Sequence, residues 1–174
     1  MGVLVAEVPL VAPAARHERP PQAVLPAVAD AFLEGGKGHN TQHLKVEPKR
    51  RVSYLKFAVT GLPAKVTRAT LKLTESGDTG GGTLRVHQGS HNDWTEDKLS
   101  TAVAPAQQKQ VGADTGQVGA GETIEIDVTP LVSGNGTYTV VLTLDQGGND
   151  IWFGSNSSSH KPELIVTAED PNAG

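Results

Sequence analysis

The sequence contains no cysteine, which excludes disulfides, thiolate metal sites and thiol nucleophiles. Aromatic residues make up only 4% of the 174 residues, so we expect a core built mainly of Val, Leu, Ile and Thr. The apolar N-terminus, MGVLVAEVPLV, has no basic start and is interrupted by Glu7 and Pro9, so it does not predict a signal peptide. It is also too short and too broken to cross a bilayer, and we expect no membrane partner.

An excess of positive charge is missing as well. The chain has 15 Lys and Arg against 19 Asp and Glu, which gives a net charge of -4. Nucleic-acid-binding domains carry a basic footprint, so we expect no nucleic-acid partner. The sequence also lacks a GxSxG motif, a P-loop and a dinucleotide fingerprint, and no helix start follows the glycine-rich GDTGGG at residues 77–82. We therefore predict that the protein is not an enzyme.

Short strand-like runs are abundant instead. Nine of them recur between residues 27 and 169, separated by turn signals such as Gly80-Gly81-Gly82 and Gly134-Asn135-Gly136. Within each run, apolar and polar residues alternate. This pattern is typical of antiparallel sheets with one dry and one wet face, and it predicts an all-β fold, a β-sandwich of two antiparallel sheets.

One connection is unusually long. Residues 93–121 contain no clear strand pattern, and loops of this length in compact domains are usually functional or held down by a few buried side chains. Trp94 is the residue expected to hold this loop against the sandwich.

The chain divides into three parts on composition. Residues 1–26 are rich in Ala, Val and Pro and are predicted to form an extended N-terminal arm and linker. Residues 27–168 form the β domain and residues 169–174 a C-terminal tail. We expect the apolar arm residues to dock on a neighbouring protein subunit; they are Val3, Val5, Val8 and Leu10.

Five motifs occur in a recognisable order across residues 27–168: ADAFLEGG, RVSYLKFAVTGLPAKVTRATLKL, NDWTE followed by APA, IEIDVTPLVSGNGTYTVVL, and IWFGSNSSSHKPELIVT. Together they resemble the DNRLRE-type carbohydrate-binding modules. The resemblance implies a jelly-roll form of the β-sandwich and a non-catalytic role. Some members of that group bind alginate and related acidic polysaccharides, so the resemblance also implies an acidic polysaccharide as partner. On a virion surface, a jelly roll of this kind is expected to bind a host glycan.

A row of polar residues is predicted on the wet faces of the sheets. Basic side chains beside an aromatic ring suit an anionic sugar, because the ring can stack on the sugar while Lys or Arg pairs with its carboxylate. The alternative is that these residues only keep the sheets solvated. The candidate carbohydrate-binding residues are Tyr54, Lys56, Arg68, Lys72, Arg85 and His87.

No cofactor is required by any motif, but a structural calcium ion is implied by the resemblance. Asp30 and Asn40 match positions that lie near calcium in related modules, and calcium takes oxygen ligands of these types. The alternative is that both residues only cap turns. Zinc is not expected, because the histidines lack the usual ligand spacing.

Two functions remain at this stage. One is a non-catalytic polysaccharide-binding module displayed on an extracellular or virion surface. The other is a purely structural subunit of an assembly, such as a phage capsid decoration or tail protein or a secreted filament, held to its neighbours by the N-terminal arm. The absence of a signal peptide and the apolar arm favour the second, and the motif order favours the first.

Overall fold

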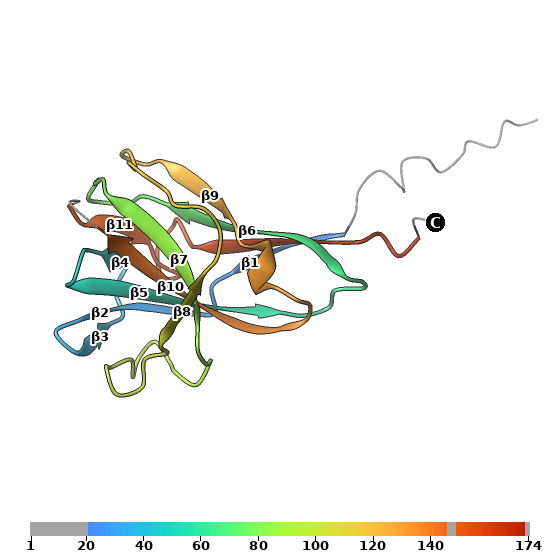
Figure 1. Ribbon diagram of the computed structural model, residues 1–174, viewed down its shortest axis with the longest axis horizontal. Coiled ribbons are helices and arrows are strands. Elements are labelled where there is room, and N and C mark those ends of the chain that lie inside the picture. Colours follow the sequence, from blue (N-terminus) through green and yellow to red (C-terminus); the bar gives the residue numbers. More distant parts are fainter. Residues whose placement is uncertain (1–20, 146–148, 173–174) are drawn as a thin grey trace, which may run out of the picture.

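Two antiparallel sheets and a short ribbon make up the computed structural model of the protein (Figure 1). One sheet has four strands, in the order β1 (Gln22–Pro26), β12 (Glu163–Ala168), β6 (Val66–Thr74) and β9 (Thr123–Asp127). The other has six, in the order β3 (Lys37–His39), β2 (Ala29–Glu34), β5 (Arg51–Val59), β10 (Gly136–Asp145), β7 (Thr83–Gly89) and β8 (Gln107–Gln110). The ribbon pairs β4 (His43–Val46) with β11 (Ile151–Gly154). A single 3-10 turn, Thr129–Leu131, is the one helical element among the described residues.

The structure describes residues 21–145 and 149–172. The arm residues Val3, Val5, Val8 and Leu10 lie outside this part of the chain. Within it, no helix is long and apolar enough to cross a membrane.

The main core lies between the two sheets, as the alternating pattern predicted. Leu55 and Phe57 of β5 and Leu71 and Leu73 of β6 are all completely buried. Each strand contributes every second residue to this core, because successive side chains point to opposite faces of a sheet. The predicted all-β sandwich of two antiparallel sheets is therefore confirmed.

A second, smaller apolar cluster lies on the other face of the six-stranded sheet. The β7–β8 loop, residues 90–106, folds back over strands β2, β5 and β10 and places Trp94 and Leu99 against Tyr54 and Val141. The sequence pattern predicted that this face is wet, and that prediction was wrong. Val141 is only 1% exposed, because the loop covers it.

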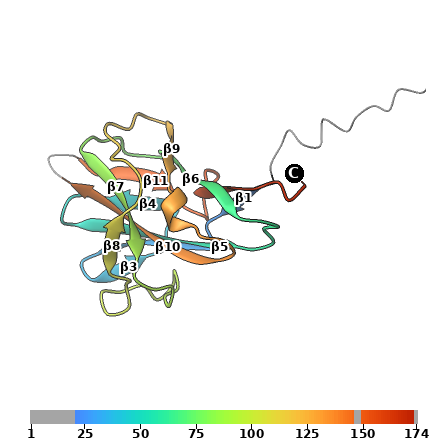
Figure 2. The same ribbon diagram turned by 45° about the vertical axis from the view of Figure 1, so that its right-hand side comes forward.

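The predicted boundary at residue 26 also needs correction. Residues Gln22–Pro26 form β1, which pairs with β12 along its whole length, and Leu25 packs against the main core. Pro26 does not prevent this pairing because it ends a strand at the sheet edge, where a missing N–H is tolerated. The β domain therefore begins by residue 22, and β1 lies close to the C-terminal end of the chain (Figure 2).

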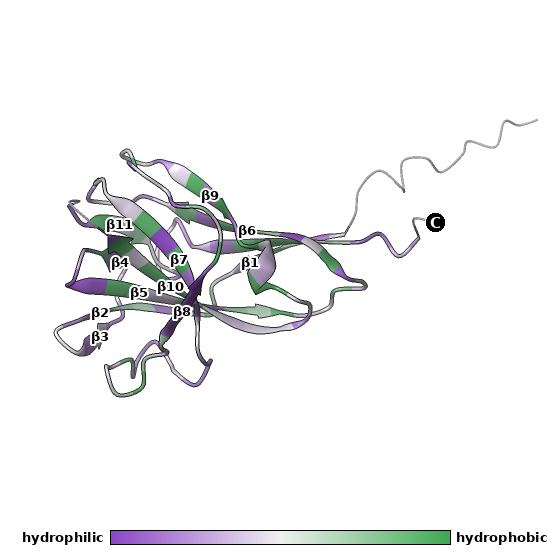
Figure 3. Cartoon of the chain, viewed as in Figure 1, coloured by the Kyte–Doolittle hydropathy of each residue, from purple (hydrophilic) through white to green (hydrophobic). Residues whose placement is uncertain are grey.

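The long connection between residues 93 and 121 is partly sheet. It contains β8, which extends the six-stranded sheet by pairing with β7, and Thr115 forms a further bridge with Leu84. Strand β8 was not predicted from the sequence, because its residues QQKQ are all hydrophilic and show no alternation (Figure 3). The first part of the connection, the β7–β8 loop, is held down by Trp94 as predicted, since this side chain is only 4% exposed.

Candidate functional site

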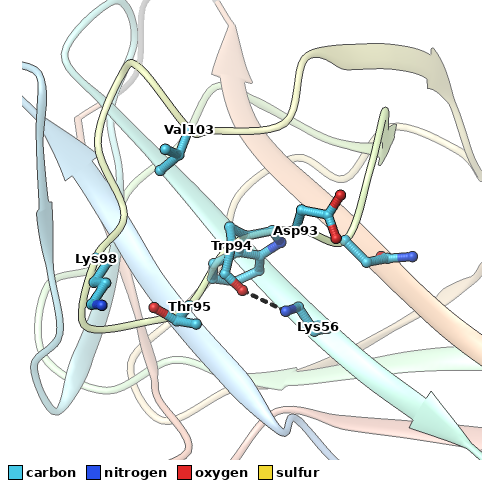
Figure 4. Close-up of a pocket in the computed structure, with 7 residues that line it drawn as sticks. Lys56, Asp93, Trp94, Thr95, Lys98 and Val103 are labelled. Atoms are coloured by element: carbon cyan, nitrogen blue, oxygen red, sulfur yellow. Dashed lines mark hydrogen bonds between the residues drawn. The ribbon is translucent and has the colours of Figure 1, made fainter.

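The β7–β8 loop and strand β5 enclose a pocket on the outer face of the six-stranded sheet (Figure 4). Its volume is about 390 Å³, within the usual range of ligand pockets. We call it the Lys56 pocket. The residues that line it are Lys56, Asn92, Asp93, Trp94, Thr95, Lys98 and Val103.

Trp94 gives the pocket a fixed wall. Its indole N–H donates a hydrogen bond to the hydroxyl of Thr139 on β10 (3.0 Å), and that hydroxyl in turn donates to Asn92 Oδ1 (2.7 Å). The ring also meets Tyr54 edge to face, with 6.2 Å between ring centroids. The buried polar atoms of the loop anchor are therefore paired, and the aromatic ring is held in one orientation.

Lys56 projects from β5 into the pocket. Its ammonium group donates to the backbone carbonyl oxygen of Trp94 and lies 4.9 Å from the centre of the indole ring (Figure 4). Burial lowers the pKa of Lys56, and the nearby carboxylate of Asp93 opposes this shift. Lys98 is the second cation of the pocket and is exposed.

This arrangement suits the binding of a polar or anionic ligand. Two ammonium groups, a hydroxyl and an amide line the pocket as hydrogen-bond donors, of which Lys56 Nζ and Asn92 Nδ2 each already donate one bond, to the carbonyl oxygens of Trp94 and Thr137. Asp93 is the only carboxylate among the lining residues, whereas glycoside hydrolysis usually requires two that face each other across the bond.

Three other predicted residues lie on the same face of the six-stranded sheet, but outside the pocket. Tyr54 is buried beneath the β7–β8 loop, and burial raises the pKa of its hydroxyl. His87 is also buried, with its ring nitrogens 3.2 Å from the carbonyl oxygen of Gln108 and 3.1 Å from the hydroxyl of Thr143. Arg85 is engaged in ion pairs with two carboxylates, those of Asp114 and Asp145.

The remaining two predicted residues lie on the opposite side of the sandwich. Arg68 and Lys72 belong to β6, which pairs with β12 and β9 in the four-stranded sheet. The predicted row of six residues is therefore not one surface. Alternation along a strand indicates which side chains point outward, but it does not indicate which of the two sheets the strand joins.

Most of the residues that line the pocket could not be predicted from the sequence. Asn92, Thr95, Lys98 and Val103 lie in an irregular loop, where periodicity carries no information. The one available signal was Trp94, because the residues next to a buried aromatic anchor are brought close to the sheet that it contacts.

A cluster of carboxylates and amides lies where the β7–β8 loop meets strand β2. The Glu96 carboxylate accepts hydrogen bonds from the backbone N–H of Asp30 (3.1 Å) and from the side-chain amides of Asn156 (3.0 Å) and Asn40 (3.3 Å). The Asn40 amide also donates to Asp97 (2.9 Å). The two residues predicted to lie near calcium, Asp30 and Asn40, are thus brought together by a loop residue that had not been predicted, Glu96.

Asp30 is the least satisfied member of this cluster. Its side chain is 1% exposed, and Oδ2 accepts a hydrogen bond from the backbone N–H of Asn156 (2.8 Å), whereas the buried Oδ1 has no hydrogen-bond partner. Burial raises the pKa of Asp30 to about 7, assisted by the charge of Glu96. The described residues provide no ion pair for Asp30, Glu96 or Asp97.

These residues offer ligand atoms of the kind that calcium binds. All offer carboxylate or amide oxygens, and the unpartnered Oδ1 of Asp30 is a free ligand. However, no three His, Asp or Glu side chains of the described residues are already gathered in a way that could hold a metal ion. The amide of Asn40 lies between Glu96 and Asp97, so a cation would have to displace it.

The sequence was also compared with known proteins. The family described as carbohydrate-binding module family 96 matches residues 21–168, which include all twelve strands and the Lys56 pocket. Among curated proteins, none matches the chain.

Proposed function

Because the chain belongs to carbohydrate-binding module family 96, we propose that it is a non-catalytic module that binds an acidic polysaccharide of the alginate type in the Lys56 pocket. The observation that supports this site most strongly is the combination of an ordered aromatic wall with two lysines. A sugar ring can lie against the edge of the indole of Trp94 while its carboxylate pairs with Lys56 or Lys98. The motif order that resembles DNRLRE-type modules supports the same ligand class.

Lys98 is the residue that tests this proposal best, because it is exposed and does not hold the loop in place. We expect Lys98→Gln to weaken binding to a uronate polymer about tenfold, which corresponds to about 1.4 kcal/mol, with no change in melting temperature. Affinity electrophoresis in gels containing alginate measures this effect. Lys109→Gln on β8 removes a charge that is also exposed but lies outside the pocket, and is the matched control.

Equal retardation of the Lys98→Gln and Lys109→Gln variants would reject the Lys56 pocket as the site. Equal retardation of the unmodified protein in gels with and without polysaccharide would reject the ligand class. Lys56 is a poorer probe than Lys98, because its contact with the Trp94 carbonyl couples it to the fold of the loop.

We also propose that calcium, when bound, would displace the Asn40 N–H from the two carboxylates it contacts and draw Asp30, Glu96 and Asp97 together, with amide oxygens of Asn40 or Asn156 as further ligands. The ion would neutralise carboxylates for which the described residues provide no cation, and it would tie the loop to β2. Calcium at one hundred times its dissociation constant is expected to stabilise the fold by about 2.7 kcal/mol. Melting curves in chelator and in excess calcium measure this shift, and magnesium at the same concentration is the control. Superimposable curves would reject a stabilising calcium site.

An assembly role is the second candidate function, and one observation favours it. Strand β1 is an edge of the four-stranded sheet, and Val24 on β1 and Val28 just after it are 52% and 55% exposed. We propose that the arm that precedes this edge, together with the edge itself, contacts a neighbouring subunit on an extracellular or virion surface. Exposed strand edges readily pair with other chains.

A chain that begins at residue 21 tests the assembly role without removing β1. We expect it to keep the circular dichroism spectrum of the full chain and to sediment as a monomer, while the full chain sediments as a larger species. If both chains sediment alike, the arm is not the connector. This truncation differs from one at residue 26, which would remove β1 and expose one side of β12.

A further inference from the structure

A second surface with an aromatic ring and cations lies on the β4–β11 ribbon. Every second residue of the ribbon is buried in the main core; these residues are Leu44, Val46, Ile151 and Phe153. The intervening residues His43, Lys45 and Trp152 lie on the other face. In Figures 1 and 2, the ribbon lies at the end of the sandwich that is distant from the C-terminus.

The ribbon continues the layer of the four-stranded sheet. The backbone N–H of Ser76, just beyond β6, donates to the carbonyl oxygen of Trp152 (2.9 Å), and the N–H of Trp152 donates to that of Asp78 (3.1 Å). Strand β11 therefore lies between β4 and the segment that follows β6. Its outward face belongs to the side of the sandwich opposite the Lys56 pocket.

Trp152 is held in place on this face. Its indole N–H donates to Asp150 Oδ2 (2.7 Å), and the same oxygen pairs with Arg51. The ammonium group of Lys45 lies 3.9 Å from the centre of the Trp152 ring, and the His43 ring is centred 5.1 Å from it. The half-buried indole thus forms a fixed aromatic platform that has a cation over its face.

A polar groove of about 340 Å³ lies beyond the Gly154 end of the ribbon. Gly154, which pairs with His43, is the last residue of β11. A Cβ atom at Gly154 would come within 2.4 Å of the carbonyl oxygen of His160. The loop that carries His160 therefore lies directly against the end of the ribbon. The groove is lined by Lys72, Thr74, Thr123, Ser159, His160, Lys161 and Glu163.

The charges of this surface leave two lysines available. Lys72 faces Glu163 at 3.9 Å, so its charge is partly compensated. Lys45 and Lys161 form no ion pair with the described residues. One lies over the aromatic platform and the other lines the groove, so a ligand that spans both would meet a cation at each end.

We propose that the surface from Trp152 and Lys45 to His160 and Lys161 is a second binding site for an acidic polysaccharide chain. A sugar ring that stacks on Trp152 would displace the Lys45 ammonium from the ring and leave it beside the sugar carboxylate. The hydroxyl-rich groove would then receive the next sugars. This inference rests on the proposed function and extends it, because sites on opposite layers allow one module to link two chains or to bind one long chain with increased avidity.

The chain has only two tryptophans, one at each proposed site, so their indole N–H signals report on the sites separately. We expect titration of the full-length, ¹⁵N-labelled protein with a short oligouronate to shift the Trp152 signal in a saturable manner. In the double variant Lys45→Gln/Lys161→Gln, the oligouronate concentration at the midpoint of the Trp152 titration should rise about tenfold or more. The midpoint concentration for Trp94 should be unchanged. Lys65→Gln/Lys109→Gln is the control with the same loss of charge.

Each outcome has a distinct meaning. If Trp94 shifts and Trp152 does not, the second site is rejected and the proposed function stands. If neither signal moves, the proposed function itself fails. If Trp152 shifts equally in the two double variants, the assignment to an acidic sugar is wrong. The turbidity of a solution of a long uronate polymer gives an independent readout. We expect the unmodified protein to raise this turbidity and the Lys45→Gln/Lys161→Gln variant to leave it unchanged.

Discussion

Replacing Asp30 with Asn is expected to raise the free energy of unfolding of the calcium-free protein at pH 8 by about 2–4 kcal/mol. Asp30 is buried with one oxygen unpartnered, and its pKa is raised from 3.8 to about 7 in the folded state. Between these values the folded protein holds a proton that the unfolded chain has released, so stability is lost as pH rises through this range. The full shift corresponds to about 4 kcal/mol.

Asparagine removes this penalty without changing the shape of the side chain. Its carbonyl oxygen can still accept the hydrogen bond from the Asn156 backbone, and its amide has no charge to desolvate. Denaturant unfolding of both proteins in chelator, from pH 4 to pH 8, gives the difference between their free energies of unfolding. The titration of most other groups cancels in this difference. We expect this difference to be small at pH 4, to grow between pH 4 and about pH 7, and to level off above that. A difference that is the same at both ends would show that Asp30 is not the group responsible.

The second large effect is expected at Trp94. Trp94→Ala should lower the free energy of unfolding by about 3–5 kcal/mol, because it removes a buried ring that packs on Tyr54 and leaves a cavity under the β7–β8 loop. It also removes the hydrogen bond that the buried hydroxyl of Thr139 accepts from the indole N–H. Since the same ring forms a wall of the Lys56 pocket, binding of a uronate polymer should be lost as well.

The control for this variant is Val103→Ala in the same loop. Val103 is 40% exposed, so we expect a change in stability of less than about 0.5 kcal/mol. Guanidinium unfolding of the two variants and the unmodified protein measures both effects. If Trp94→Ala were no less stable than Val103→Ala, the loop would not be anchored through the indole, and the pocket would not be preformed.

The sheets could be predicted from the sequence because alternation is a local signal. Leu55, Phe57, Leu71 and Leu73 are buried as their spacing required, and each of the nine expected runs contains a strand. The additional strands β1, β3 and β8 are short or polar, so their sequences carry little periodicity.

The candidate site was only partly predictable, because it depends on contacts between distant segments. Alternation placed Lys56 on an outward face, but it did not reveal that residues 90–106 return to cover that face. The same limit applies to the acidic cluster. Asp30 and Glu96 are 66 positions apart, and no local pattern in either segment indicates that they meet.

The prediction that Tyr54 is one of the carbohydrate-binding residues on a wet face also changes in the light of the fold. Tyr54 is 6% exposed and packs edge to face against the Trp94 ring. A change at Tyr54 is therefore expected to reduce stability, whereas binding is better examined through Lys98.

The most direct test of the central claim is a crystal structure of the full chain with a bound oligouronate. We predict electron density for at least one sugar in the Lys56 pocket, with a sugar carboxylate within hydrogen-bonding distance of Lys56 Nζ or Lys98 Nζ and the sugar ring against Trp94. A complex in which the oligouronate is bound elsewhere on the protein, while the Lys56 pocket holds only water and is not blocked by a neighbouring molecule, would contradict the account.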